Sequence, residues 1–275
     1  MIMKLYLIQA VTCVLTLFLL FSCSDDDSVE IPVSPKTFVL VHGSFQGPFA
    51  WQYVKDQLIK KGQKVVVVEL PAHGEDKTAP AAVSIDVYRD KVVSAISPLE
   101  GKVVLVGHSL AGLVISTTAE KIPDKIEKLV YIAGFVPANG QSLLDLSSTD
   151  STSLLGHALI PSDDQLTLDI AAANVAPIFA QDGSADIKKL LLDNKRVEPA
   201  IPFINKVAVS AANFGKVAKY YIHTSKDMAV GPALQKRMVA AATGFKKTYT
   251  LDSSHSPFLT QPEKVTDILM EVSKL

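Results

Sequence analysis

Residues 102–121 read KVVLVGHSLAGLVISTTAEK, and the fold can be predicted outward from this stretch. Val103 to Val106 form an unbroken apolar run, which is typical of a strand buried on both faces of a parallel sheet. A turn with Ser109 at its centre follows, and apolar residues then recur at helical spacing from Leu113. The pattern G-x-S-x-G between a strand and a helix places a serine hydroxyl on a sharp turn beside free backbone N–H groups. We therefore interpret Ser109 as a candidate nucleophile rather than as an ordinary helix-capping serine.

Five further apolar runs predict the other strands of this sheet. They are residues 37–41, 64–70, 128–135, 218–224 and 247–251. Helical patterns separate most of them, over about 48–61, 84–97, 232–242 and from 261 onward. This alternation predicts an α/β fold: a mostly parallel sheet of about six strands, with helices on both faces and right-handed crossovers. If the strand order is second, first, third, fourth, fifth, sixth, ligands would bind between the loops after the first and third strands.

The composition is that of a globular protein with a large core. The chain has 275 residues, of which 48% are hydrophobic and 20% charged, and its formal net charge is −1. This length fits a single α/β domain, and without a basic surplus we expect no nucleic-acid partner. Both cysteines, Cys13 and Cys23, lie near the N-terminus. The rest of the chain therefore has no thiol for a disulfide or a thiolate-ligated metal.

The N-terminus has the pattern of a targeting segment. Residues 1–22 are mostly apolar after a basic start, which predicts a secretory signal peptide; the alternative, a retained transmembrane anchor, would need a longer run. Residues 20–23 (LFSC) resemble the lipobox of bacterial lipoproteins, which implies cleavage before Cys23 and lipidation of that residue. Residues 24–36 would then be a flexible tether to a domain of residues 37–275. We expect a lipid-anchored protein of a bacterial cell envelope, periplasmic or surface-exposed.

The alternation of strands and helices breaks between residues 137 and 217. This stretch contains five prolines and short helical patterns around 166–173 and 187–194. An insertion of this length between two core strands is more often a lid or binding element than a bare loop, so we expect a helical cap over Ser109. Its apolar residues could line a pocket or pack the cap onto the sheet: Leu143, Leu144, Leu154, Leu155, Ile178, Phe179, Phe203 and Ile204.

A serine hydroxyl needs a base to take its proton, and the base needs a third group to orient it. Of the six histidines, His255 follows the last predicted strand, at the sheet edge where the carboxyl-end loops converge. We predict His255 as the base, because a neutral imidazole suits this role. Two carboxylates compete for the orienting role. Asp227 follows the fifth strand, whereas Asp252 lies only three residues before His255, so the order Ser, Asp, His favours Asp227.

An oxyanion formed from a substrate carbonyl would need hydrogen-bond donors. We predict one donor as the backbone N–H of Leu110, directly after Ser109. The other would be the N–H of Ser44, in the loop after the first strand. The two loops, 42–47 and 107–112, flank the predicted switch point of the sheet, where open α/β folds bind their ligands.

Six separated motifs resemble one group of proteins in content and in order. They are FVLVHGSFQGPFAW, LPAHGED, KVVLVGHSLAG, KLVYIAGFVPANGQSLLDL, YYIHTSKDMAVGPALQKRM and LDSSHSPFLTQPE. Together they are similar to the small α/β-hydrolases grouped with plant methylesterases and hydroxynitrile lyases, and to their bacterial esterase-like relatives. The resemblance covers nearly all of residues 37–275 and is weakest in the cap. It implies an α/β-hydrolase fold, a triad of Ser109, Asp227 and His255, and an oxyanion hole made by the N–H groups of Ser44 and Leu110.

Two departures from the family pattern are informative. Ala111 stands where the family usually has glycine, and it is small enough for the turn. Family members that are lyases carry a threonine after the loop histidine and a lysine after the catalytic histidine, whereas this chain has Gly43 and Ser256. Without that cation to stabilise departing cyanide, we do not expect lyase activity.

The residues and the resemblance together imply a serine hydrolase that cleaves carboxylic esters through an acyl-serine intermediate, without metal or cofactor. Its expected substrates are small to medium esters with an apolar portion, because the cap residues available to line a pocket are mostly apolar. Two alternatives remain open at this point. One is a ligand-binding lipoprotein that keeps the fold without the chemistry, and the other is a cofactor-free perhydrolase with the same triad.

Overall fold

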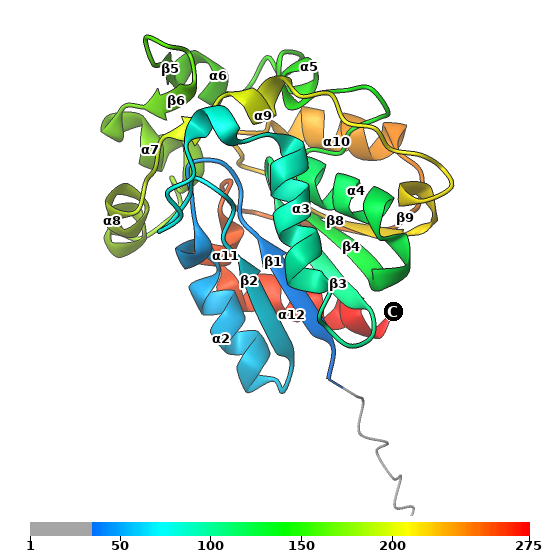
Figure 1. Cartoon of the computed structure of the whole chain (residues 1–275). Helices are drawn as coiled ribbons and strands as arrows, with labels where there is room; N and C mark the ends of the chain where they lie inside the picture. Colours follow the sequence, from blue (N-terminus) through cyan, green and yellow to red (C-terminus); the bar gives the residue numbers. More distant parts are fainter. Residues whose placement is uncertain (1–34) are drawn as a thin grey trace, which may run out of the picture. The chain divides into compact units, whose positions relative to one another are not determined.

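A six-stranded, fully parallel sheet forms the centre of the domain (Figure 1). The computed structural model describes residues 35–275. In spatial order the strands are β2 (Lys64–Val68), β1 (Thr37–Val41), β3 (Val103–His108), β4 (Ile126–Ile132), β8 (Ala218–Thr224) and β9 (Phe245–Leu251). The predicted fold class and the predicted strand order are confirmed. The order reverses between β1 and β3, so the loops after these two strands flank the switch point of the sheet.

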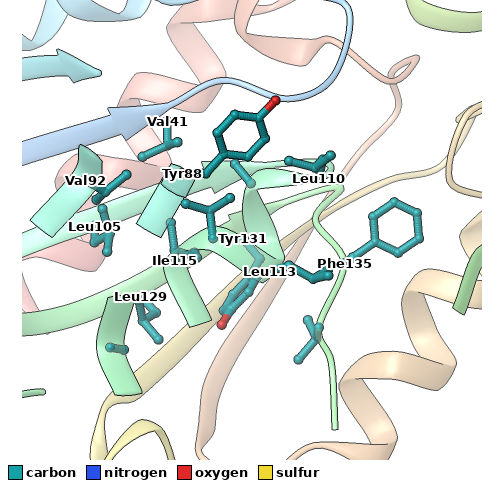
Figure 2. Close-up of a cluster of buried hydrophobic side chains, with 14 of the residues drawn as sticks. Val41, Tyr88, Val92, Leu105, Leu110, Leu113, Ile115, Leu129, Tyr131 and Phe135 are labelled. Carbon is teal, nitrogen blue, oxygen red and sulfur yellow. The ribbon is translucent and has the colours of Figure 1, made fainter. Parts of the chain in front are cut away.

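The inner strands are apolar along their length because side chains are buried on both faces of the sheet. Successive residues of β1 alternate between two buried clusters: Val39 and Val41 belong to one, Phe38 and Leu40 to the other. Leu105 of β3 belongs to the first cluster, which Figure 2 shows in close-up. The register of β1 with its neighbouring strands therefore decides which side chains enter each cluster. A shift of one residue would exchange the side chains of the two clusters.

Helices cover the sheet on two sides. The first cluster includes residues of α3 (Ile85–Ile96), α4 (Ala111–Lys121) and α10 (Pro232–Ala241). The second includes residues of α2 (Gln52–Lys60), α11 (Pro257–Thr260) and α12 (Pro262–Lys274). Short 3-10 turns lie at η1 (Pro48–Trp51), η2 (Pro80–Ala82) and η3 (Pro123–Lys125).

The predicted core helices are present close to their predicted limits. The helix predicted over 48–61 opens as the 3-10 turn η1 and continues as α2. Helix α3 begins where predicted because the hydroxyl of Ser84 accepts a hydrogen bond from the Val87 N–H at 3.2 Å, which satisfies one of the free donors of the first turn.

The segment between β4 and β8 forms a cap that combines helices with a small antiparallel sheet. Its elements are α5 (Leu143–Ser147), α6 (Leu155–Ala158), β5 (Leu159–Pro161), β6 (Thr167–Ile170), α7 (Ala172–Phe179), α8 (Ala185–Asp193), β7 (Glu198–Pro199), α9 (Ile201–Ile204) and η4 (Phe214–Lys216). The helix predicted at 187–194 is confirmed as α8. The helix predicted at 166–173 is wrong, because β6 lies there and pairs with both β5 and β7. Leu166, Leu168 and Ile170 alternate with other residues, which is the period of a strand. A purely helical cap is therefore an incomplete description.

The predicted signal peptide, the lipidation site Cys23 and nearly all of the predicted tether lie outside the described residues. Lys36, which the sequence assigned to the tether, is held by the domain: its N–H donates to Gln63 Oε1 at 2.8 Å, and its Nζ pairs with Glu127 at 2.9 Å. Among residues 35–275, no helix is both long and apolar enough to cross a bilayer.

Gly112 gives a stability test of how closely α4 packs behind Ser109. A Cβ at this position would lie 2.1 Å from the carbonyl oxygen of Phe135, so backbone would have to shift. We expect Gly112→Ala to destabilise the protein by about 1–3 kcal/mol and to lower its melting temperature by about 3–10 °C. Gly156→Ala is the matched control, because a Cβ there meets nothing within 4 Å. Equal melting temperatures for the two variants would contradict the close packing.

Candidate active site

Ser109 lies on the turn between β3 and α4 with its backbone in the left-handed region, at φ 53°. Three backbone hydrogen bonds hold it there: its N–H donates to Ile132 O at 3.3 Å, and its carbonyl accepts from Gly112 N–H at 2.9 Å and Phe135 N–H at 3.0 Å. A left-handed residue with a side chain costs about 1–2 kcal/mol, so the surroundings must impose this conformation. Such strain is typical of a nucleophile on a strand-to-helix turn. Ala111 is the first residue of α4 and does not have a positive φ, so glycine is not required at this position.

His255 and Asp227 form a buried pair at the same edge of the sheet. His255 donates from Nδ1 to Asp227 Oδ2 at 2.7 Å, and both side chains are fully buried. The Asp227 carboxylate also accepts the N–H groups of Ala229 and Val230, both at 2.8 Å, and the hydroxyl of Thr224 at 2.7 Å. These bonds fix the orientation of the ring and place its proton on Nδ1. The lone pair of Nε2 is then free to accept a proton.

Asp252, the competing carboxylate, has different partners. It lies at the surface, where it accepts from Lys226 Nζ at 2.8 Å and from the Ser225 hydroxyl at 3.0 Å. The hydrogen bond from Lys226 is the largest of the effects that lower the pKa of Asp252 below its usual value. The structure therefore brings Asp227, and not Asp252, to His255.

Ser109 and His255 are not hydrogen-bonded to each other in this structure. Within the described residues, His255 Nε2 is buried and has no hydrogen-bond partner. His108 holds the segment of His255 in place, because its Nε2 donates to the His255 carbonyl at 3.0 Å and the two ring centroids lie 4.4 Å apart. Burial lowers the pKa of His108 well below its usual value, so this ring stays neutral. Catalytic hydrogen bonds are often long without substrate and shorten in the complex, and Nε2 is the acceptor that a bond from Ser109 would use.

The loop after β1 lies directly against the Ser109 turn. A Cβ at Gly43 would lie 2.8 Å from both His108 Nδ1 and Ser109 Cβ, so only glycine allows this approach. Within residues 35–275, the backbone N–H groups of Ser44 and Leu110 donate to no carbonyl of the main chain. The Leu110 side chain is buried in the first cluster (Figure 2), which fixes the residue. Both predicted oxyanion donors are thus free at the switch point of the sheet.

Some groups that support the site were not predicted from the sequence. Gln46 donates from Nε2 to the Ser256 hydroxyl at 3.1 Å, which joins the loop after β1 to the segment of His255. Asp182 of the cap accepts the Ser254 N–H at 3.1 Å and also the Ser254 hydroxyl. The position of Gln46 beside Ser44 was a signal in the sequence, but Asp182 offered none, because only the fold brings the cap to His255.

A cavity of about 280 Å³ lies over Ser109 and Ser44. Four of the eight predicted apolar cap residues line it: Leu143, Leu144, Leu155 and Phe203. Of the others, Ile178 and Phe179 are buried in the core, whereas Leu154 and Ile204 are exposed. Polar cap residues also line the cavity, among them Ser147, Ser148, Asp150 and His157. Among the described residues, no three His, Cys, Asp or Glu side chains converge as a metal site.

A serine on a strained strand-to-helix turn, with a histidine that a buried carboxylate orients at the same edge of a parallel sheet, is the arrangement typical of serine hydrolases. The order of the strands and the placement of these residues define the class of the fold as that of the α/β-hydrolases. The chain belongs to the alpha/beta hydrolase family, whose sequence profile matches residues 38–268.

Comparisons with individual proteins agree with this family. The chain is 29% identical over 250 residues to putative methylesterase 11 of Arabidopsis thaliana, covering 86% of this chain and 64% of that protein. It is 27% identical over 253 residues to methylesterase 1 of the same plant, covering 86% and 95%. The chain thus spans less than two thirds of the first relative. In fold it is similar to the solved structure of polyneuridine aldehyde esterase, with a TM-score of 0.78 at 23% identity over 87% of this chain and 99% of that chain.

The bond between His255 and Asp227 can be tested by proton NMR. With Nδ1 only 2.7 Å from Oδ2 of a buried carboxylate, the proton on Nδ1 should give a strongly downfield signal. We expect Asp227→Asn to abolish this signal, because an amide cannot replace the carboxylate as a charged acceptor. Asp252→Asn is the matched control and should leave the signal in place. Loss of the signal in Asp252→Asn, with retention in Asp227→Asn, would reverse the assignment.

Proposed function

We propose that the protein hydrolyses carboxylic esters through an acyl-serine intermediate on Ser109. The observation that carries this proposal is the buried bond between His255 Nδ1 and Asp227, at the sheet edge where Ser109 lies on its strained turn. That bond uses Nδ1, so Nε2 of His255 is the ring nitrogen that can accept the proton of the serine hydroxyl. The names of the methylesterase relatives support ester cleavage.

The proposed reaction has two halves. In the first, His255 Nε2 takes the proton of Ser109 as the hydroxyl oxygen attacks the ester carbonyl, and the N–H groups of Ser44 and Leu110 stabilise the oxyanion. The imidazolium then protonates the departing alcohol, which leaves an acyl-serine. In the second half, His255 takes a proton from water, the hydroxide attacks the acyl-serine, and the acid leaves as the proton returns to Ser109.

The proposed substrates are small to medium esters with an apolar portion. The cavity over Ser109 has about 280 Å³ and includes apolar side chains such as Leu143 and Phe203, which suit an acyl or alcohol group of modest size. Lyase chemistry has no support, because Gly43 and Ser256 stand at the positions of the lyase threonine and lysine. A purely ligand-binding role has none either, since the strained turn and the buried His–Asp pair are unnecessary for binding alone.

Replacement of the nucleophile tests the proposal. We expect Ser109→Ala to lower the hydrolysis of a chromogenic butyrate ester by at least about 10⁴-fold and to abolish labelling by a fluorophosphonate. Ser97→Ala, at an exposed serine after α3, is the control and should keep full activity. The assay should extend to a panel of esters, thioesters and lactones. If the unaltered protein turns over none of them faster than Ser109→Ala does, the proposal fails.

We also propose that the mature protein begins at Cys23 and is held at a bacterial envelope membrane by acyl chains. The support is the sequence pattern of residues 1–23, with its apolar run and terminal LFSC. Several acyl chains give stable anchorage, whereas a single chain binds a membrane only weakly.

Labelling with a fatty acid tests this anchorage. We expect the unaltered protein to be labelled and to sediment with membranes, and Cys23→Ala to lose both properties. Cys13→Ala is the matched control, because Cys13 lies in the segment that would be removed, and it should behave like the unaltered protein. A Cys23→Ala protein that is still labelled and membrane-bound would refute the assignment.

A further inference from the structure

A second buried pair of ionisable groups lies under the loop after β1. Glu198, on strand β7 of the cap, is fully buried. Its Oε2 accepts a hydrogen bond from the backbone N–H of Phe45 at 2.7 Å and lies 2.9 Å from His73 Nε2. The two partners of Glu198 therefore come from the loops after β1 and β2, whereas Glu198 itself comes from the cap.

Both nitrogens of the His73 ring have hydrogen-bond partners. His73 Nδ1 lies 3.0 Å from the carbonyl oxygen of Pro71, and Nε2 faces the Glu198 carboxylate. The Pro71 carbonyl can only accept, so Nδ1 carries a proton, and Nε2 faces the carboxyl oxygen that also accepts the Phe45 N–H. Burial alone would lower the pKa of His73, but the charge of Glu198 and its hydrogen bond outweigh burial and raise that pKa above its usual value. The adjacent His42 is neutral, because burial lowers its pKa to about 3.

Stability alone does not account for this arrangement. Within the described residues, Glu198 Oε1 is buried without a hydrogen bond of ordinary geometry, and burial together with the nearby Glu198 carboxylate raises the pKa of the buried Tyr88 hydroxyl. Buried ion pairs that leave polar atoms unsatisfied are often no more stable than apolar side chains of the same size. A gain in stability therefore does not explain this pair. The hydrogen bond between Glu198 and the Phe45 N–H suggests that the pair positions Phe45.

The cap holds Phe45 by both of its backbone polar groups. Glu198 accepts the Phe45 N–H, and the Arg196 N–H donates to the Phe45 carbonyl at 3.3 Å. Phe45 has φ 61°, a left-handed conformation that is rare for a residue with a bulky side chain. These bonds thus impose the direction of the chain immediately after Ser44, whose N–H is a proposed oxyanion donor. On its other side, Ser44 follows Gly43, which lies against Ser109.

We propose that Glu198 is a positioning residue for the oxyanion hole: by anchoring the peptide N–H of Phe45 from the cap, it holds the Ser44 N–H in the direction that the reaction needs. This inference rests on the proposed ester hydrolysis. A donor that acts on the transition state must be held to within about 0.5 Å and 10–20°. His73 Nε2 and the Phe45 N–H meet the same oxygen of Glu198, so the His73 ring also helps to hold that acceptor in place. The cap therefore supports the oxyanion hole in addition to covering Ser109.

Two substitutions with side chains of nearly equal size distinguish the effect of losing the hydrogen-bond acceptor from the effect of changing the side-chain volume. Glu198→Gln keeps an oxygen that can accept the Phe45 N–H, whereas Glu198→Met fills the same space and cannot accept. We expect Glu198→Met to lower kcat for the butyrate ester by about 10–100-fold with KM within about threefold, because a lost oxyanion donor acts on the transition state and not on substrate binding. Glu198→Gln should stay within about fivefold of the unaltered kcat.

The control is Asp169→Asn, which removes the ion pair of Asp169 with Lys195 in the same small sheet of the cap. This variant loosens the cap without touching Phe45 and should keep kcat. All rates are taken per folded molecule, from circular dichroism below each melting point, and Glu198→Ala is measured as a second variant without an acceptor in case Glu198→Met does not fold.

Hydrogen–deuterium exchange gives a readout that does not depend on turnover. The amide of Phe45 should exchange faster in Glu198→Met than in Glu198→Gln or Asp169→Asn. Equal kcat and equal exchange in Glu198→Met and Glu198→Gln, or a rise in KM with kcat unchanged, would overturn the positioning role while ester hydrolysis stands. An unaltered protein that turns over no ester would instead refute the proposed function, and the exchange data would still decide whether Glu198 anchors Phe45.

Discussion

The left-handed backbone of Ser109 is the constraint on which the rest of the site depends. The turn can exist only while Ile132 and Phe135 supply its hydrogen bonds from behind, which requires β3 and β4 to stay in register. In front, Gly43 brings the loop after β1 within contact of the Ser109 side chain. Three adjacent parallel strands thus cooperate to hold one strained residue, and the cost of about 1–2 kcal/mol is spread over their packing. The hydroxyl is placed before any substrate arrives.

Two buried histidine–carboxylate pairs flank this turn with different tasks. His255 and Asp227 join the loops after β9 and β8, and their bond leaves the other ring nitrogen without a partner among the described residues. His73 and Glu198 join the loop after β2 to the cap, and both ring nitrogens there face acceptors. The first pair therefore keeps one ring nitrogen available for a further hydrogen bond, as the proposed reaction requires, while the second pair has none available. A carboxylate in such surroundings is costly unless hydrogen bonds surround it, which explains why each pair also binds backbone N–H groups.

The sequence was sufficient for the parts of the site that local pattern encodes. Buried parallel strands are continuous apolar runs, so their number and the loops at their carboxyl ends could be predicted, and with them the places of Ser109, Asp227 and His255. The spatial order of the strands was taken as a condition, and the place of the switch point between the first and third strands followed from it. The choice between Asp227 and Asp252 rested on chain order alone, and the structure gives its physical reason. Asp227 has a buried position with backbone donors, whereas Asp252 is paired with Lys226 in solvent.

The cap was predicted as an insertion, but its small sheet was not, because the contacts of that sheet are between residues distant in the chain. Leu166 to Ile170 had the period of a strand, but a strand of four residues is stable only beside partners that no local pattern announces. Glu198 lies 125 positions from His73 and 153 from Phe45, and alone in the sequence it reads as one more surface carboxylate. Its burial follows from the fold of the cap. Its hydrogen bond with the Phe45 N–H in turn joins the cap to the loop after β1. The cap is thus the segment that the sequence predicts least well. In our proposal it is also the segment that sets the direction of the Ser44 N–H.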